Sequence, residues 1–146
     1  MRKEFVMRGQ TASGQTEVLN FGKYKQGYAY RMTEFAIYPS TGISSANWEI
    51  TGTVTAGKTA VTPTDPNFND DGLIATSMSQ DYNSSLGPIS NMTIVNDTYI
   101  ITQNLILMVQ NTENTPINWQ CRFESVKMTG PEEAAVNYKQ FAISDE

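Results

Sequence analysis

Histidine is absent from this chain of 146 residues, and cysteine occurs once, at Cys121. Without histidine there is no imidazole to transfer protons near neutral pH or to bind a metal. A single cysteine can form neither an internal disulfide bond nor a thiolate zinc cluster. Cys121 alternates with Trp119 and Phe123, so we expect it to be a small buried core residue. These absences remove the commonest catalytic and metal-binding groups, and the sequence predicts a protein that is not an enzyme.

Charged residues are also scarce, at 17% of the chain, with a net charge of −5. Binding to nucleic-acid phosphates depends on lysine and arginine, so we expect no nucleic-acid partner. No apolar run approaches the roughly 20 residues of a membrane-spanning helix. The first residues, MRKEFVMRG, lack the apolar segment of a signal peptide. We therefore expect a soluble protein that is made in the cytoplasm and has no membrane partner.

Threonine, asparagine, serine and glutamine supply most of the polarity, a composition typical of strands joined by turns. Eight stretches are predicted as strands: EFVMR, TEVLNF, YAYRMTEFAIYP, NWEITGTVTAG, GLIATSMS, ISNMTIV, TYIITQNLILMVQ and INWQCRFESVKMT. The seventh stretch reads either as one strand with a polar interruption or as two short strands. Strands at such short spacings indicate a sandwich or barrel. We predict a single domain, residues 1–146, with an all-β fold: a β-sandwich, most simply a jelly roll.

The third stretch changes the parity of its apolar residues partway along. Tyr28, Tyr30 and Met32 are spaced by two, but Phe35 and Ile37 continue on the opposite parity. A shift by one residue is what a β-bulge requires, and a strand that passes from one sheet to another requires it too. The sequence leaves both interpretations open.

The end of the chain, TGPEEAAVNYKQFAI, has a helical pattern. Thr129 and Glu132 form a capping box, and Pro131 falls in the first turn, where its missing N–H costs nothing. Apolar residues then recur at helical spacing from Ala135. We predict one short C-terminal helix over about residues 131–143.

The loop DPNFNDDG contains the strongest candidate for a metal site. Its oxygen-bearing side chains alternate as in the first half of a calcium loop: Asp65, Asn67, Asn69 and Asp71. The EF-hand pattern nevertheless fails, because Asp70 stands where glycine is required and Thr76 where the bidentate glutamate belongs. An irregular calcium site remains one interpretation, and a solvated cluster of turn residues is the default. We predict no cofactor.

Three glutamates lie within predicted strands: Glu34, Glu49 and Glu124. Acid–base catalysis by carboxylates requires a shared cleft in which their environments differ. Glu49 and Glu124 alternate with apolar residues, so we expect both to point away from the core. Exposed charges that deter pairing at strand edges account for them more simply than catalysis does.

Two aromatic residues lie in loops, Phe68 and Tyr82, the second beside Asn83. An aromatic ring outside the core can stack on a sugar ring or on a partner surface, with neighbouring amide and carboxylate groups, such as that of Asp81, as hydrogen-bonding partners. Local packing is the simpler interpretation. If these residues do bind, the sequence predicts a contact with a partner protein or a carbohydrate at Phe68, Tyr82 and Asn83.

The two ends of the chain have a recognisable succession of elements. MRKEFVMRG opens it, and the block YIITQNLILMVQNTENTPINWQCRFESVKM…PEEAAVNYK supplies a penultimate strand, an asparagine-rich hairpin, a long alternating strand and a short helix. Over the first residues and the final third, the chain resembles small β-rich virion structural proteins of marine bacteriophages. The resemblance includes no diagnostic motif, and it assigns no functional residue.

This resemblance implies a capsid decoration (cement) protein or a jelly-roll coat subunit, located in the virion and made in the host cytoplasm. Its expected partners are copies of itself, in a homo-oligomer, and a major capsid or other virion protein. The alternative is a carbohydrate-binding or receptor-binding module of a phage tail or fibre.

Overall fold

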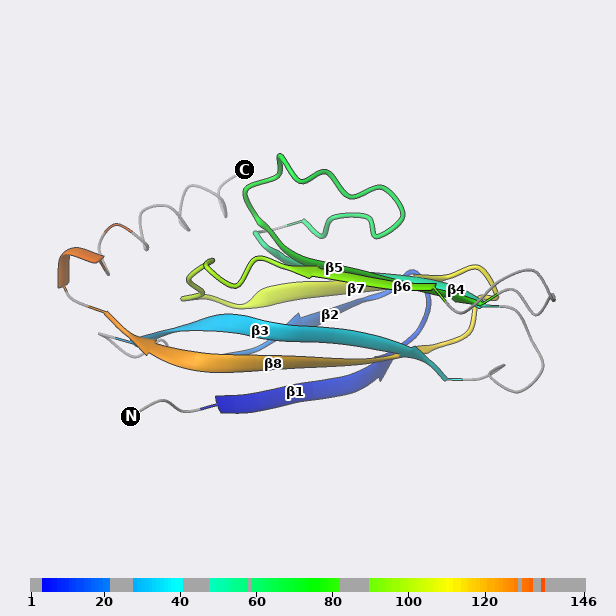
Figure 1. Ribbon diagram of the computed structural model, residues 1–146, viewed down its shortest axis with the longest axis horizontal. Helices are drawn as coiled ribbons and strands as arrows, with labels where there is room; N and C mark the ends of the chain where they lie inside the picture. Colours follow the sequence, from blue (N-terminus) through cyan, green and yellow to red (C-terminus); the bar gives the residue numbers. More distant parts are fainter. Residues whose placement is uncertain are drawn as a thin grey trace.

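The computed structural model describes residues 4–21, 28–40, 48–57, 59–81, 90–128, 130–132 and 135. Two antiparallel sheets lie face to face (Figure 1). Their strands are β1 (Glu4–Thr11), β2 (Thr16–Leu19), β3 (Tyr28–Pro39), β4 (Trp48–Ala56), β5 (Leu73–Asp81), β6 (Ser90–Val95), β7 (Leu105–Asn111) and β8 (Ile117–Lys127). The all-β sandwich predicted from the sequence is confirmed.

The order of the strands is that of a jelly roll with one departure. One sheet has the order β1-β8-β3, and the other has the order β2-β7-β4-β5-β6. A jelly roll nests four antiparallel pairs, first with eighth, second with seventh, third with sixth and fourth with fifth. Three of these pairs are present. The exception is β6, which pairs with β5 and leaves β3 at the edge of the smaller sheet.

The core fills the space between the inner faces of the two sheets. Its largest fully buried side chains include Phe123, Met32, Ile50 and Leu107. At one end, the rings of Phe123 and its aromatic neighbours are in contact at centroid distances of 4.9–6.1 Å, a group made up of Phe5, Phe21, Tyr30 and Phe123. Such aromatic packing supplies much of the burial that stabilises a sandwich of this size.

Gly9 makes room for an indole ring in this core. It pairs in register with Trp119, and a Cβ added at Gly9 would lie 2.9 Å from Cζ2 of that ring. The indole N–H of Trp119 donates a hydrogen bond to the hydroxyl of Thr11 over 2.9 Å. The absence of a side chain at Gly9 therefore lets Trp119 lie across β1 with its polar atom satisfied.

The parity change in β3 is a β-bulge. Its register against β8 shifts between Met32 and Glu34, and both Met32 and Phe35 are buried. The bulge keeps apolar residues on the inner face along the whole strand. Tyr28 shares the parity of Tyr30 and Met32, but its side chain is exposed.

Two other sequence predictions are settled in part. The stretch TYIITQNLILMVQ forms one strand, β7, preceded by an isolated bridge between Tyr30 and Ile101. Residues 130–132 and 135 are helical, and the rest of the helix predicted over 131–143 lies outside the described residues.

The connection between β4 and β5 covers part of the outer face of the larger sheet (Figure 1). The hydroxyl of Thr53 donates a hydrogen bond to the carbonyl of Val61 over 2.6 Å, and the N–H of Val61 donates to the hydroxyl of Thr55 over 3.4 Å. Both threonines are buried as a result, although alternation places them on the outer face. The connection is therefore tied to the sheet through its backbone.

Candidate binding surfaces

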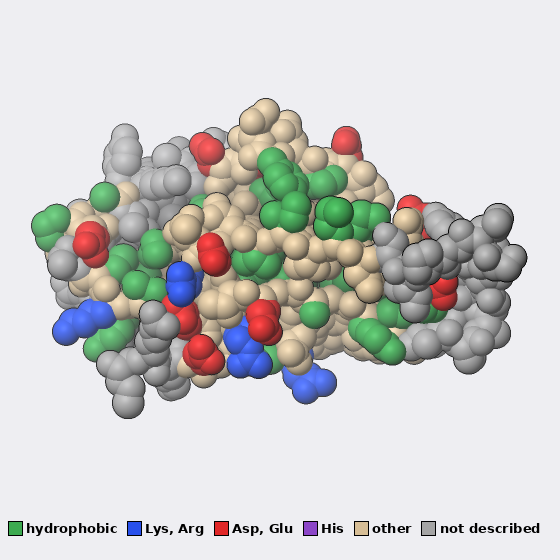
Figure 2. Space-filling model, in the orientation of Figure 1, with side chains coloured by type: hydrophobic (Ala, Val, Ile, Leu, Met, Phe, Trp, Pro, Cys, Tyr) green, Lys and Arg blue, Asp and Glu red, His purple; other side chains and the backbone are tan. Residues whose placement is uncertain are grey.

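The outer face of the three-stranded sheet is charged and internally paired. Arg122 of β8 lies between two carboxylates: its Nε is 3.3 Å from Glu34 on β3, and its Nη1 is 3.8 Å from Glu4 on β1. Most of the lysine and arginine side chains visible in Figure 2 lie over this layer, with acidic side chains beside them. Arg122 and these two carboxylates are therefore paired with one another within the chain.

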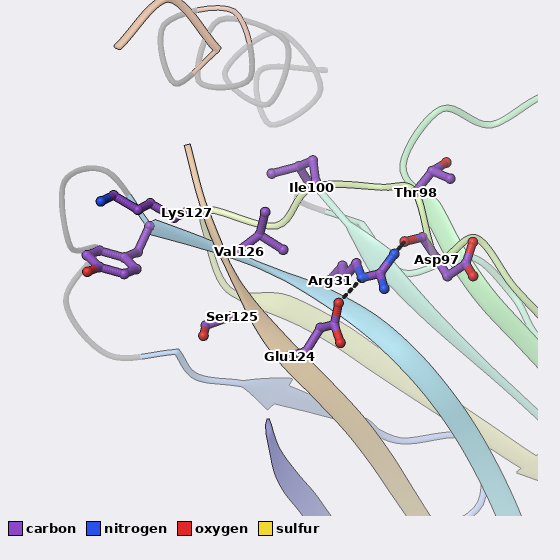
Figure 3. Close-up of a pocket in the computed structure, with 9 residues that line it drawn as sticks. Arg31, Asp97, Thr98, Ile100, Glu124, Ser125, Val126 and Lys127 are labelled. Carbon is purple, nitrogen blue, oxygen red and sulfur yellow. Dashed lines mark hydrogen bonds and ion pairs between the residues drawn. The ribbon is translucent and has the colours of Figure 1, made fainter. Parts of the chain in front are cut away.

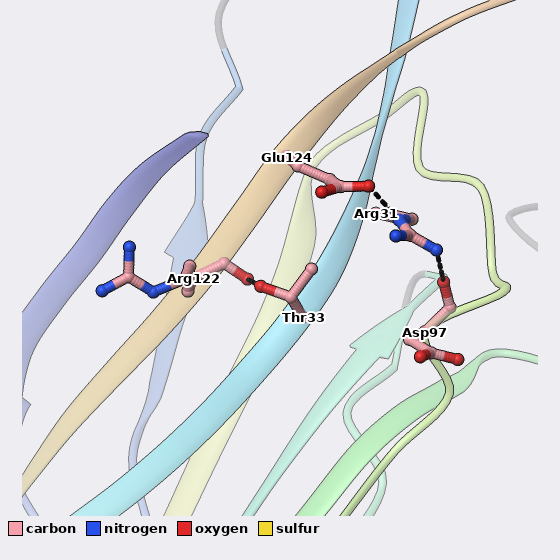
Figure 4. Close-up of polar contacts among 5 residues, drawn as sticks. All are labelled: Arg31, Thr33, Asp97, Arg122 and Glu124. Carbon is pink, nitrogen blue, oxygen red and sulfur yellow. Dashed lines mark hydrogen bonds and ion pairs between the residues drawn. The ribbon is translucent and has the colours of Figure 1, made fainter. Parts of the chain in front are cut away.

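Glu124 on the same face is buried, with 5% of its surface exposed. Arg31 Nε donates a hydrogen bond to its carboxylate, and Arg31 Nη1 donates to the backbone carbonyl of Asp97 over 3.5 Å (Figure 4). Glu124 points away from the core, as predicted. The prediction that its charge is exposed was wrong. The connection after β6 lies against the free edge of β3, where Tyr30 and Ile101 exchange two backbone hydrogen bonds, and this brings Asp97 to Arg31.

A hollow of about 650 Å³ opens beside this ion pair. Its lining comes from β3, β8 and the connection after β6: Tyr28, Arg31, Asp97, Thr98, Ile100, Glu124, Ser125, Val126 and Lys127 (Figure 3). Arg31 and Glu124 point toward each other, and the carboxylate of Asp97 is turned away from Arg31 (Figure 4). The arrangement pairs an acid with a cation, whereas acid–base catalysis by two carboxylates requires both to face one substrate.

The three strand glutamates are not brought together. Glu34 and Glu124 lie on the outer face of the three-stranded sheet, where Glu34 is exposed and paired with Arg122. Glu49 lies on the outer face of β4, across the sandwich. The structure therefore places no two of these carboxylates in one cleft.

The acidic loop before β5 uses its side chains to form turns. Asn67 Oδ1 accepts a hydrogen bond from the N–H of Asn69 over 3.0 Å, and Asp70 Oδ1 accepts one from the N–H of Gly72 over 2.9 Å. The described part of the chain contains no group of three or more histidine, cysteine, aspartate or glutamate side chains that could hold a metal ion. The hydrogen bonds of Asn67 and Asp70 agree with the turn interpretation of this loop.

Two buried groups have strongly raised pKa values. Burial, and secondly the negative charge of Asp71, raises the pKa of the Tyr99 phenol to about 12. Burial raises the pKa of the Cys121 thiol to about 12. A thiol in this state is no nucleophile at neutral pH. Sequence reasoning anticipated the burial of Cys121 but missed Tyr99, because only the folded chain brings it to Asp71.

The outer face of the five-stranded sheet carries an exposed apolar patch. Phe68, Met78, Met92 and Ile94 form this patch, with 60%, 37%, 61% and 46% of their surfaces exposed. Met78 and Met92 are cross-strand partners on β5 and β6. Figure 2 shows a group of hydrophobic side chains over this layer. The patch borders a hollow of about 360 Å³, whose other lining residues include two prolines of the covering connection, Pro63 and Pro66.

Of the predicted carbohydrate-contact residues, Phe68 is exposed in this patch, and Tyr82 and Asn83 lie outside the described residues. Sequence reasoning missed Met92 and Ile94. Both alternate with Asn91, Thr93 and Val95 as in any half-buried strand, and nothing in that pattern reveals that β6 is an edge strand on which Met92 and Ile94 are exposed.

No family model, no curated protein and no solved structure matches this chain. Within the described residues, no helix has both the length and the apolar character that crossing a membrane would require.

Proposed function

We propose that this protein is a non-enzymatic structural subunit of a virion shell, as a coat or capsid decoration protein. It stabilises the shell through symmetric contacts with copies of itself and with a major capsid or other virion protein. The observation that supports this most directly is the exposed apolar patch of Phe68, Met78, Met92 and Ile94 on a sandwich that has three of the four strand pairs of a jelly roll. Exposed apolar patches mark contact surfaces, and jelly rolls are common in capsids.

The charged groups and the thiol support a structural role over a catalytic one. The three strand glutamates lie on two opposite outer faces, and the buried carboxylate of Glu124 is held by Arg31. Cys121 has a raised pKa and is fully buried. Neither these glutamates nor the cysteine has the arrangement that acid–base or covalent catalysis requires.

Two measurements test the proposal. Mass spectrometry of purified virus particles should find the chain in tens to hundreds of copies, as symmetry demands of a shell component. Sedimentation velocity of the isolated chain should show association that grows with concentration. A chain that is absent from particles and remains monomeric at high concentration would overturn the proposal.

The second candidate is a carbohydrate-binding or receptor-binding module of a phage tail or fibre. Phe68 supports it, since an exposed ring beside a hollow can stack on a sugar, and lectin domains share the jelly roll. On a glycan array, Phe68→Ala should abolish binding, and Val18→Ala should retain it. Val18 is equally exposed but lies on β2, away from the hollow. Absence of glycan binding by the unmodified chain would remove this candidate.

A further inference from the structure

The four edge strands of the sandwich differ in how they are protected from further pairing. Edge strands are usually blunted by charges, proline, shortness or a covering segment. On the smaller sheet, β1 has Glu4 and Arg8, and the free edge of β3 is bridged by Ile101. On the larger sheet, β2 is four residues long and includes Glu17. The fourth edge strand, β6, has the sequence SNMTIV, with no charge and no proline.

The backbone of β6 has groups directed away from the sheet. The N–H of Asn96 donates a hydrogen bond to the carbonyl of Ile74, one position beyond the β5–β6 ladder. Hydrogen-bonded pairs alternate along an antiparallel ladder, so the even-numbered residues of β6 bond to β5. The N–H and carbonyl groups of Asn91, Thr93 and Val95 therefore point outward. Among the described residues none of these outward groups has a backbone partner.

We propose, on the basis of the proposed function, that copies of this protein associate by antiparallel pairing of β6 with β6 of a second copy across a two-fold axis. A two-fold contact must be self-complementary, and an antiparallel strand pair meets that condition. The strand is neutral in a chain of net charge −5, so its approach to its own copy brings no like charges into opposition.

One register pairs all three outward-facing residues. With the axis at Thr93, that residue lies opposite Thr93 of the second copy, and Asn91 lies opposite Val95. Each of these pairs exchanges two backbone hydrogen bonds. On the outer face, Met92 then lies opposite Ile94 of the second copy, and Ile94 lies opposite Met92. The two apolar patches merge into one apolar strip.

The patch is needed as well as the strand. A specific interface of standard size uses about 20–30 residues on each side, far more than one short strand supplies. Phe68 and Met78 border β6 on the outer face and are exposed, so they extend the buried area beside the new strand pair. The two-fold contact would thus satisfy the free backbone edge and cover the apolar side chains at once.

Thr93→Pro tests the pairing by removing one backbone N–H group. The N–H of Thr93 points away from β5, so proline at this position removes no hydrogen bond between β5 and β6. Thr93→Val is the matched control, because both variants lose the hydroxyl contact with Ser77 and only proline loses the N–H. In sedimentation velocity, Thr93→Val should dimerise like the unmodified chain, and Thr93→Pro should dimerise about tenfold more weakly or not at all.

A cross-link gives a second measurement that does not depend on how well the proline variant folds. Thr93→Cys should form a covalent dimer under mild oxidation, since identical residues face each other at the axis. Val18→Cys, on the opposite edge strand, should not. The native thiol of Cys121 is fully buried and gives little background.

The outcomes separate this inference from the proposed function. Equal association of Thr93→Pro and Thr93→Val, or no cross-link in Thr93→Cys, would overturn the pairing of β6 while leaving assembly through another surface intact. A monomeric unmodified chain that is nevertheless abundant in virus particles would overturn only the two-fold contact. A chain that is both monomeric and absent from particles would overturn both.

Discussion

The two outer faces of this sandwich obey the same alternation rule but leave different chemistry at the surface. On the three-stranded sheet the outward residues include two ion pairs, Arg31 with Glu124 and Arg122 with Glu34, alongside the exposed side chains of Val6 and Tyr38. On the five-stranded sheet the outward residues are threonines under a covering connection and, beyond it, the apolar patch at β6. Charges that are paired within the chain need no further partner at a surface exposed to water. An apolar face beside an unpaired edge is stabilised only by further contacts.

The largest effect on stability is expected on the charged face. Arg31→Ala would remove the Arg31 cation from the buried carboxylate of Glu124 and should lower the free energy of unfolding by about 2–4 kcal/mol. The measurement is urea unfolding at neutral pH. Arg122→Ala is the control, since its partners are exposed and the loss should be below about 1 kcal/mol. An equal decrease in the free energy of unfolding for both variants would show that the burial of Glu124 does not strengthen its ion pair with Arg31.

Alkaline pH should destabilise the fold through two buried groups, Tyr99 and Cys121. The pKa of Tyr99 and that of Cys121 are raised to about 12 in the folded state, above their values in the unfolded chain. The contribution of each group to stability is therefore complete only below its unfolded pKa, which is 9.0 for the thiol and 10.0 for the phenol. It falls as pH rises toward 12, by about 1.4 kcal/mol per pH unit for each group.

Two substitutions separate these contributions. Tyr99→Phe should remove the part of the alkaline loss of stability that the phenol causes. Cys121→Ala should remove the part that the thiol causes. Thermal unfolding measured between pH 8 and 12 provides the comparison. If neither substitution changes the loss of thermal stability at alkaline pH, other titrating groups dominate that loss.

The covering connection should contribute a smaller amount to the five-stranded face. Thr53→Val removes the hydroxyl that donates to the Val61 carbonyl and should cost about 1 kcal/mol. Thr76→Val is a matched control, because Thr76 is the cross-strand partner of Thr53 on the same face. Denaturant titration should separate the two variants, and indistinguishable midpoints would mean that the Thr53 hydrogen bond contributes nothing net.

The smallest effect on stability is expected at the apolar patch itself. Met92→Lys replaces a side chain that is mostly exposed and should change the free energy of unfolding by less than about 0.5 kcal/mol. Its effect on association should be large, because a lysine would then face Ile94 of the second copy. Val18→Lys provides the control on β2. Association is measured by sedimentation velocity. Equal association of Met92→Lys and Val18→Lys would contradict the inference that the patch, and not the surface of β2, forms the contact.

Particular residues show how far sequence reasoning reaches. Alternation in β3 predicted its bounds, and the parity change between Met32 and Phe35 predicted a shift that the structure shows to be a bulge. The same rule placed Glu124 on an outer face but could not predict its burial. That depends on Arg31 and on the connection after β6, which is remote in sequence. For the candidate site, Phe68 was predicted as an exposed loop aromatic, whereas Met92, Ile94 and Tyr99 were not recognised.

The sequence by itself determined the strands and the sandwich, because the alternation of side chains across a strand is a local property of the backbone. Only the tertiary structure decided the order of the strands. Among the described residues, β6 pairs with β5 and not with β3, so Met92 and Ile94 lie on a neutral edge strand whose outer edge pairs with no described strand. That choice depends on long-range packing of the two sheets, which a pattern within one strand does not encode.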